Sequence, residues 1–134
     1  MRNKIEPSDK ILVAGAKGMA GSAIMRSLRN HNYGSKNNGG TILTPTRQEV
    51  DFSNNMQTHY WFKKNKPSVV IIAAAKVGGI IANSQCPADF ILENLKIQNN
   101  IIEEAWRNDV KRLLFLGSSC IYPKYSMQPI KEEA

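Results

Sequence analysis

The sequence predicts an α/β fold built around a parallel β-sheet. Four apolar runs of strand length alternate with segments whose apolar residues recur at helical spacing; the runs are residues 11–14, 41–44, 68–74 and 111–116. The run at 68–74 is continuous and rich in Val and Ile, which is typical of a strand buried on both faces of a parallel sheet. Strands that alternate with helices are joined by right-handed crossovers, so we expect all four strands to run in one direction.

The first strand leads into a tight turn and a helix. The strand ends at Gly15, and apolar residues at helical spacing predict a helix over residues 19–28. Residues 30–40 are dominated by Gly, Asn, Ser and Lys, which predicts a flexible surface loop before the second strand.

The rest of the chain predicts two further helices. Ser53 is a suitable N-cap for a helix that reaches about Asn65. Residues 88–107 carry apolar side chains along one stripe, which predicts a long amphipathic helix before the fourth strand. With 134 residues the chain is long enough for one domain and too short for two ordinary ones, so we expect a single domain over residues 1–134.

The composition restricts the classes of function. The chain is 42% hydrophobic and 22% charged, as in soluble globular proteins, and no run of about 20 apolar residues predicts a membrane helix. A formal charge of +7 favours an anionic partner, which a nucleotide, a nucleic acid or an anionic surface would each satisfy. No basic helix or aromatic platform organises that charge for DNA or RNA, so we expect no nucleic-acid partner and no membrane.

The N-terminal residues and the cysteines indicate the compartment. Residues 1–10 are polar and lack the apolar stretch of a secretory signal peptide. Cys86 and Cys120 provide neither a disulfide framework nor the paired CxxC spacing of a zinc site. We therefore expect a cytoplasmic protein without a metal site.

Three glycines between the first strand and the first helix are spaced for binding a dinucleotide. Gly15 permits a tight turn, Gly18 lets the backbone approach a pyrophosphate, and Gly21 lets the helix pack closely on the strand. The phosphates would lie at the helix N-terminus, where N–H groups and the helix dipole favour anions. We expect Lys17 and Met19, within the turn, to contact the cofactor as well. A purely structural turn is the alternative, because glycine turns join strands and helices in many folds.

The residues after the second strand favour NADP(H) over NAD(H). NAD binders usually place an acidic side chain there for the ribose hydroxyls, whereas NADP binders place a cation for the 2′-phosphate. Arg47 follows the strand in this chain, and Lys17 lies in the glycine turn. Either cation also fits a solvated surface charge. Asp51 fits two roles equally, as the cap of the next helix or as a partner of the adenine amino group.

Hydroxyl and thiol groups follow the fourth strand. Ligands of open parallel sheets bind beyond the carboxyl ends of the strands, and the sequence places Ser118, Ser119 and Cys120 there. These groups suit chemistry on a substrate, although a cysteine at this position also fits a small buried hydrophobe. Tyr122 and Lys124 either line the same site or form the turn that follows.

Several motifs together resemble the extended short-chain dehydrogenase/reductases. They are Gly15 to Gly21, Ala73-Ala-Ala-Lys-Val-Gly-Gly79, Pro87-Ala-Asp-Phe90, Asn94 with Gln98-Asn-Asn-Ile-Ile102, and Gly117-Ser-Ser-Cys-Ile-Tyr-Pro-Lys124. Within that family the chain is similar to the NADPH-dependent epimerase/reductases that convert GDP-4-keto-6-deoxymannose to GDP-L-fucose. The resemblance implies a Rossmann-type doubly wound parallel sheet that is incomplete, with only the first four strands and their helices.

The resemblance also implies roles for single residues. The reaction epimerises C3 and C5 of the sugar and then transfers hydride to C4. Ser118 would hydrogen-bond the keto oxygen, and Cys120 would transfer protons. The cofactor would contact Ala73, Ala74 and Lys76. Asn99 would face the site from the long helix, although it fits an ordinary polar helix residue nearly as well, and Lys76 also fits a lysine that snorkels from a strand end.

Two parts of the family pattern are missing from the sequence. The family's Tyr-x-x-x-Lys pair lies beyond residue 134, and the match from Tyr60 to Lys64 falls in the predicted second helix, away from the strand ends. The sugar-nucleotide domain and the family's histidine acid are also missing, so His31 and His59 are expected at the surface.

We therefore expect the cofactor-binding part of a longer enzyme that acts on a GDP-sugar and forms a homodimer. Two other functions fit the same residues. One is a catalytically inactive dinucleotide-binding fragment, and the other is a related sugar-nucleotide epimerase or dehydratase that retains NAD.

Overall fold

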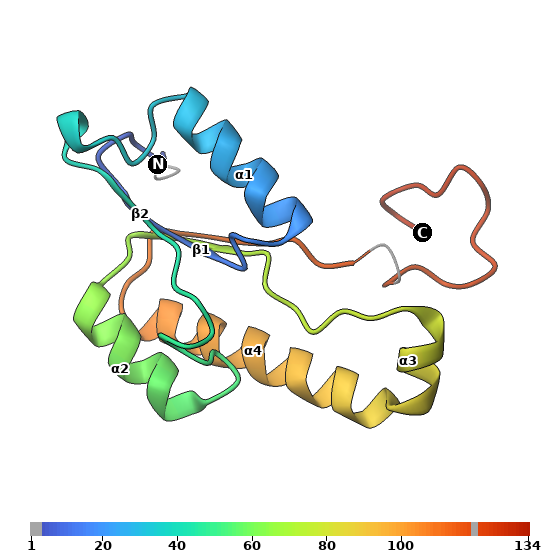
Figure 1. Cartoon of the computed structure of the whole chain (residues 1–134). Helices are drawn as coiled ribbons and strands as arrows, with labels where there is room; N and C mark the ends of the chain where they lie inside the picture. Colours follow the sequence, from blue (N-terminus) through green and yellow to red (C-terminus); the bar gives the residue numbers. More distant parts are fainter. Residues whose placement is uncertain (1–3, 119–120) are drawn as a thin grey trace.

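The computed structural model describes residues 4–118 and 121–134, and a four-stranded parallel sheet forms its centre (Figure 1). The elements in chain order are β1 (Lys10–Ala14), α1 (Met19–Asn30), the 3-10 helix η1 (Lys36–Asn38), β2 (Thr41–Leu43), α2 (Asn55–Asn65), β3 (Val69–Ile72), α3 (Ile80–Gln85), α4 (Pro87–Arg107) and β4 (Arg112–Phe115). All three strand pairs are parallel. The predicted α/β fold is therefore confirmed.

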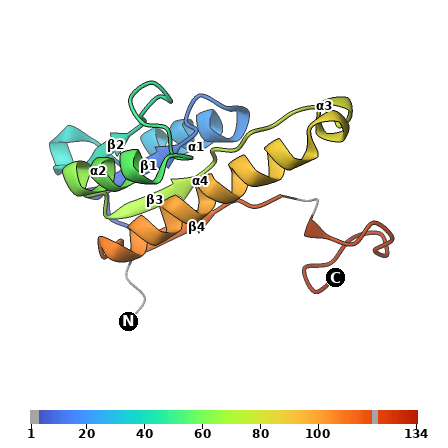
Figure 2. The ribbon, with the colours of Figure 1, turned by 90° about the horizontal axis from the view of Figure 1, so that it is seen from below.

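Helices cover both faces of the sheet. Figure 1 shows α1 on one face and α2 and α4 on the other, and Figure 2 views that second face from below with α4 in front. Successive side chains of a strand point to opposite faces, so Ile11 and Val13 of β1 pack in the cluster beneath α1. Leu12 and Ala14 pack in the other cluster, with Phe62 of α2 and with α4. Both faces of β1 are thus buried, and every residue of β3 is buried as well, as the continuous apolar run at 68–74 predicted.

The sheet grows in both directions from β1. The strand order is β2-β1-β3-β4, so β2 pairs with one side of β1 and β3 pairs with the other. The point where the strand order reverses is the topological switch point of the sheet. In open α/β sheets, ligands bind there, beyond the carboxyl ends of the strands. The loops after β1, β2 and β3 are therefore the place to look for a site.

The start of α2 differs from the prediction, because Asn54 and not Ser53 caps the helix. Asn54 Oδ1 accepts a hydrogen bond from the backbone N–H of Gln57 at 3.1 Å. The Ser53 hydroxyl instead donates to Asp51 Oδ1 at 2.7 Å. Ser53 is thereby tied to the preceding loop, and the prediction of a cap at this residue is wrong.

Two short helical elements lie where the sequence predicted none. The η1 turn falls within the loop at residues 30–40, and α3 lies just before the long helix. None of the six residues of α3 is buried. The segment therefore lacks the apolar stripe that marks a helix in a sequence.

Apolar side chains are exposed along β4, which is the last strand in the described sheet. Leu114 is 52% exposed and Phe115 is 45% exposed, whereas every residue of β3 is buried. An uncovered strand edge is a site for association with another chain. In the part of the chain that the structure describes, no helix has the length and apolar character to cross a membrane.

Loss of the Asn54 cap should destabilise the domain. Asn54→Ala should lower the free energy of unfolding by about 1 kcal/mol, because one N–H in the first turn of α2 loses its acceptor. Asn54→Ser keeps an oxygen acceptor at the N-cap and should stay close to wild type. Urea unfolding followed by circular dichroism measures both, and equal losses in the two variants would contradict the capping role.

The uncovered edge of β4 should make the isolated chain self-associate. Light scattering over a concentration series should show an apparent mass that rises above that of a monomer. Leu114→Lys places a charge on the edge and should shift the equilibrium toward monomer. The control is Met56→Lys, which alters an exposed residue of α2. A clean monomer at high concentration would contradict the prediction.

Candidate functional site

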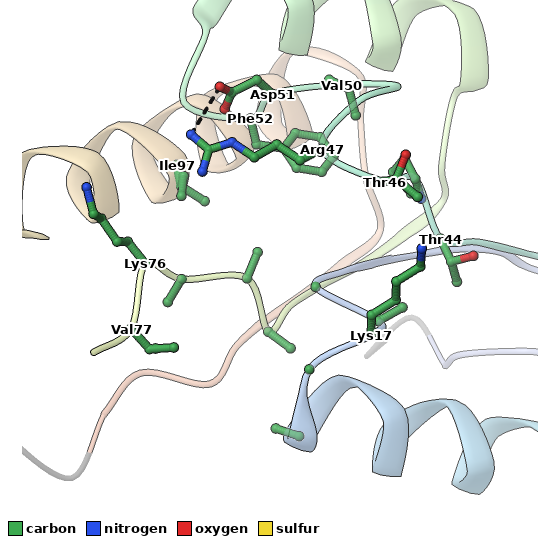
Figure 3. Close-up of a pocket in the computed structure, with 18 of the residues that line it drawn as sticks. Lys17, Thr44, Thr46, Arg47, Val50, Asp51, Phe52, Lys76, Val77 and Ile97 are labelled. Carbon is green, nitrogen blue, oxygen red and sulfur yellow. Dashed lines mark hydrogen bonds and ion pairs between the residues drawn. The ribbon is translucent and has the colours of Figure 1, made fainter. Parts of the chain in front are cut away.

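A groove of about 860 Å³ opens at the carboxyl ends of β1, β2 and β3 (Figure 3). The loops after these three strands line it, together with two residues of α4; the lining residues are 15–20, 44–48, 50–52, 73–77, 93 and 97. The groove thus lies at the switch point of the sheet, where the topology predicts a ligand.

The glycine turn gives the groove its backbone wall. Gly15 has a φ of +83°, and a Cβ on it would lie 2.7 Å from the carbonyl carbon of Ala73. A Cβ on Gly21 would collide with the carbonyl of Gly15, so these two glycines are required by the packing of the turn itself. A Cβ on Gly18 would meet only the Gly15 oxygen, at 3.4 Å. The fold therefore does not require glycine at position 18, and close approach of a ligand there stays a prediction.

The first turn of α1 borders the groove beside these glycines. Gly18 is the N-cap residue, and no side chain of the described residues caps the helix. Lys17, Met19 and Ala20 line the groove at this point. Backbone N–H groups at an uncapped helix start, next to a lysine, favour an anion.

The loop after β2 is held by its own hydrogen bonds. Glu49 Oε2 accepts hydrogen bonds from the backbone N–H and the hydroxyl of Thr46, at 2.7 and 2.9 Å. Asp51 Oδ1 accepts two hydrogen bonds from Ser53, at 2.9 and 2.7 Å. The loop is thus pre-formed, and its Thr44, Arg47 and Asp51 line the groove.

Asp51 braces this loop and is not the cap of α2. Burial raises the pKa of the Asp51 carboxyl, but the hydrogen bonds from Ser53 and the charge of Arg47 outweigh burial, so the pKa lies below its ordinary value. Asp51 is therefore a carboxylate at neutral pH. The cap alternative for this residue is wrong, because Asn54 has that role, and an adenine contact stays a prediction.

Charged side chains meet across the groove in a network that the sequence did not reveal. Arg47 Nη2 lies 3.3 Å from Asp51 Oδ2 and 3.0 Å from Glu93 Oε1. Lys76 Nζ lies 3.0 Å from Glu93 Oε2. The hydrogen bond from Lys76 lowers the pKa of Glu93, and the charge of Arg47 lowers it further. Glu93 thus joins the loop after β2 to the loop after β3.

Lys76 is fixed at the mouth of the groove by α4. Asn94 Oδ1 accepts the backbone N–H of Lys76 at 2.7 Å, and Asn94 Nδ2 donates to the Lys76 carbonyl at 3.0 Å. The Lys76 ammonium also lies 5.4 Å from the centre of the Phe90 ring. Lys76 is therefore a positioned cation and not a lysine that only snorkels to solvent.

Asn99 does not line the groove, and its expected role at the reaction site after β4 stays a prediction. Glu93 and Ile97, four residues apart, face the groove from α4. Each helical residue turns the side-chain direction by about 100°, so a residue two positions beyond Ile97 points to nearly the opposite side. The Asn99 side chain is exposed and lies 3.5 Å from the Gln98 amide.

Only part of the predicted catalytic group after β4 lies among the described residues. Ser118 is exposed in the loop after β4, and it is not a lining residue of the groove. Ser119 and Cys120 lie outside the described residues. Beyond them, the Ser126 N–H and hydroxyl both donate to the Pro123 carbonyl, which closes a local turn. Tyr122 and Lys124 belong to this turn region and do not line the groove.

The match from Tyr60 to Lys64 lies in α2, no residue of which lines the groove. Phe62 is fully buried in the core, and Trp61 packs edge-on against Phe52. Phe62 and Trp61 anchor the helix to the core, whereas Tyr60 is exposed.

The two histidines differ in their surroundings. His31 is exposed at the end of α1, where its ring nitrogen contacts the Ser27 carbonyl at 2.8 Å. The His59 side chain is only 30% exposed, and its Nδ1 lies 3.1 Å from the carboxylate of the buried Glu104. The prediction of a surface position thus holds for His31 and only partly for His59.

The chemistry of the groove fits an elongated anion with an apolar part. Three cations line it, one of them in the glycine turn at a helix N-terminus, and Val50, Phe52 and Ile97 add apolar surface. No group of three or more His, Cys, Asp or Glu side chains suited to a metal ion occurs among the residues described.

Comparisons with known proteins find a matching family over nearly the whole chain. A model described as "NAD dependent epimerase/dehydratase family" matches residues 11–134. A GDP-L-fucose synthase of Sinorhizobium fredii is 50% identical over 125 residues, which make up 93% of this chain and 38% of that protein.

Solved structures show the same similarity. MlghC, a GDP-mannoheptose C4 reductase from Campylobacter jejuni with NADP bound, matches 97% of this chain and 39% of its own with a TM-score of 0.87 and 38% identity. A GDP-L-fucose synthetase from Naegleria fowleri bound to NADP matches 96% of this chain and 36% of its own with a TM-score of 0.79 and 26% identity. The chain spans less than two fifths of the length of each of these three proteins.

Substitutions at Gly18 and Gly21 should differ in their effect on the free energy of unfolding. Gly21→Ala should lower the free energy of unfolding by about 3 kcal/mol or abolish folding, because the new methyl group meets backbone that cannot move aside. Gly18→Ala should stay within about 1 kcal/mol of wild type, because its φ of −71° is open to any residue. Thermal and urea unfolding measure both, and similar losses at positions 18 and 21 would contradict this reading of the turn.

Proposed function

The chain belongs to the NAD dependent epimerase/dehydratase family, and from this we propose that it is the NADP(H)-binding part of an epimerase/reductase that converts GDP-4-keto-6-deoxymannose to GDP-L-fucose. The groove at the switch point carries the proposal, because it combines a glycine turn at a helix start with three cations among its lining residues. The similarity to GDP-L-fucose synthases over nearly the whole chain supports the substrate class.

The cofactor would lie along the groove from the loop after β2 to the loop after β3. The pyrophosphate would bind the backbone of Gly15, Gly18 and Met19 at the start of α1, where the helix dipole favours it. The adenosine would lie against the loop that contains Asp51, with Ala73 and Ala74 beneath it. The nicotinamide end would extend past Lys76, toward the end of β4.

A cation at the adenosine end supports NADP(H) over NAD(H). The loop after β2 presents Thr44, Thr46 and Arg47 to the groove, and Lys17 reaches toward Thr44 from the glycine turn (Figure 3). A carboxylate placed directly after β2 would repel a 2′-phosphate, and the first acid of this loop that lines the groove, Asp51, is already held by Ser53 and Arg47. Lys17 and Arg47 are the proposed phosphate partners.

The proton chemistry would take place at the end of β4. Bound NADPH supplies the hydride for C4 of the sugar. Ser118 would donate a hydrogen bond to the keto oxygen, which stabilises negative charge there while a neighbouring ring proton is removed. Cys120 would exchange that proton, as the resemblance of its motif implies.

The proposal is tested by comparing the affinity of the chain for NADPH, which carries the 2′-phosphate, with its affinity for NADH, which does not. Lys17→Gln should weaken NADPH binding by about tenfold, because a charge-assisted hydrogen bond to phosphate is lost, and should change NADH binding by less than about twofold. Titration of nicotinamide fluorescence gives both dissociation constants. Lys36→Gln, which alters an exposed lysine of η1 outside the groove, is the matched control. An equal loss for both cofactors would contradict the proposed position of the phosphate, and failure of the wild-type chain to bind either cofactor would refute the proposed function.

A further inference from the structure

Glu93 holds two of the three cations that line the groove. Its Oε1 lies 3.0 Å from Arg47 Nη2 and its Oε2 lies 3.0 Å from Lys76 Nζ. Lys17 is the third cation of the lining, and the carboxylates are Asp51 and Glu93. Arg47 thus lies between two carboxylates, so its charge is largely balanced before any ligand binds.

The two partners of this ion pair differ in their freedom to move. The Glu93 side chain is 20% exposed, whereas that of Arg47 is 69% exposed. Glu93 is also held from its other oxygen by Lys76, and its lowered pKa keeps it charged at neutral pH. An incoming anion would therefore draw the guanidinium of Arg47 away from Glu93, and Glu93 would stay in place. Figure 3 shows Arg47 reaching from its loop toward Ile97 of α4, across the space that a ligand would enter.

We propose that Glu93 sets the cofactor selectivity of the groove by competing with the 2′-phosphate of NADP(H) for Arg47. This role rests on the proposed function, and it makes Glu93 a specificity-determining residue that acts through Arg47. The competition applies only to a cofactor that carries the 2′-phosphate. NADH offers no anion to Arg47 and leaves the Arg47–Glu93 pair intact.

The expected effect is modest, because Arg47 is largely exposed and solvent screens its interactions. An ion pair of this kind corresponds to a factor of about two to five in a binding constant. Removing the charge of Glu93 while keeping its shape should therefore strengthen NADPH binding by about that factor. NADH binding should change by much less.

The test is a double-mutant cycle with two cofactors. Dissociation constants for NADPH and NADH are measured by nicotinamide fluorescence for wild type, Glu93→Gln, Arg47→Ala and the double variant. We expect Glu93→Gln to raise the ratio of NADPH affinity to NADH affinity by about two- to fivefold in wild type and to leave the ratio unchanged in the Arg47→Ala background. Glu103→Gln is the matched control, since Glu103 lies on the same helix and pairs with Arg107 at 2.6 Å, outside the groove.

Each other outcome overturns the inference. Equal changes for both cofactors would mean that Glu93 only supports the local structure. A selective loss of NADPH affinity in Glu93→Gln would mean that Glu93 positions Arg47 for the phosphate instead of competing with it. An effect that persists without Arg47 would place the competition at another cation. Absence of cofactor binding by wild type would refute this inference and the proposed function together, whereas normal wild-type binding with an unchanged ratio would refute this inference alone.

Discussion

The site depends on the close approach of two backbone segments at the centre of the sheet. Ala14 of β1 pairs in register with Ile72 of β3, and the Ala73 N–H donates to the Ala14 carbonyl at 2.9 Å. The chain after β1 must therefore turn away within contact of Ala73, and a side chain at position 15 would strike that backbone. Glycine is the residue that permits this turn. The turn leads directly into α1, whose first residues border the groove. The groove and the direction of the α1 N-terminus both follow from this single approach.

Features that depend on neighbouring residues were predictable from the sequence. The four strands follow from contiguous apolar runs, and α4 follows from its apolar stripe, so each was placed to within a few residues. Gly15, Gly18 and Lys17 are close together in the chain, and a turn between a strand and a helix brings them to one wall of the groove. Ala73 and Lys76 were expected there because parallel strands end at the same edge of a sheet. Gly21 was predicted both to pack the helix closely on the strand and to belong to the cofactor-binding glycines; it packs against Gly15, but it does not line the groove.

Features that depend on distant residues were not predictable in the same way. Glu93 gave no signal, because an acidic residue on an amphipathic helix is ordinary until the loop that carries Arg47 is placed against it. Ser53 and Asn54 were both possible N-caps of α2. The Ser53 hydroxyl donates a hydrogen bond to Asp51 instead, and the sequence alone does not determine this. For Glu93 the deciding contact joins side chains from different elements, whereas for Ser53 it is a local hydrogen bond to Asp51 that competes with helix capping.

The proposed cofactor groove and the proposed reaction site lie on strands that differ in burial. The groove is formed at β1 and β3, which are central strands with buried side chains on both faces. Ser118 follows β4, which pairs only with β3 among the described strands and exposes its apolar residues. Local openings are most frequent where few apolar contacts hold the backbone. The geometry of the proposed cofactor groove is therefore set by the core of the domain, whereas the geometry of the proposed reaction site depends on an exposed edge strand.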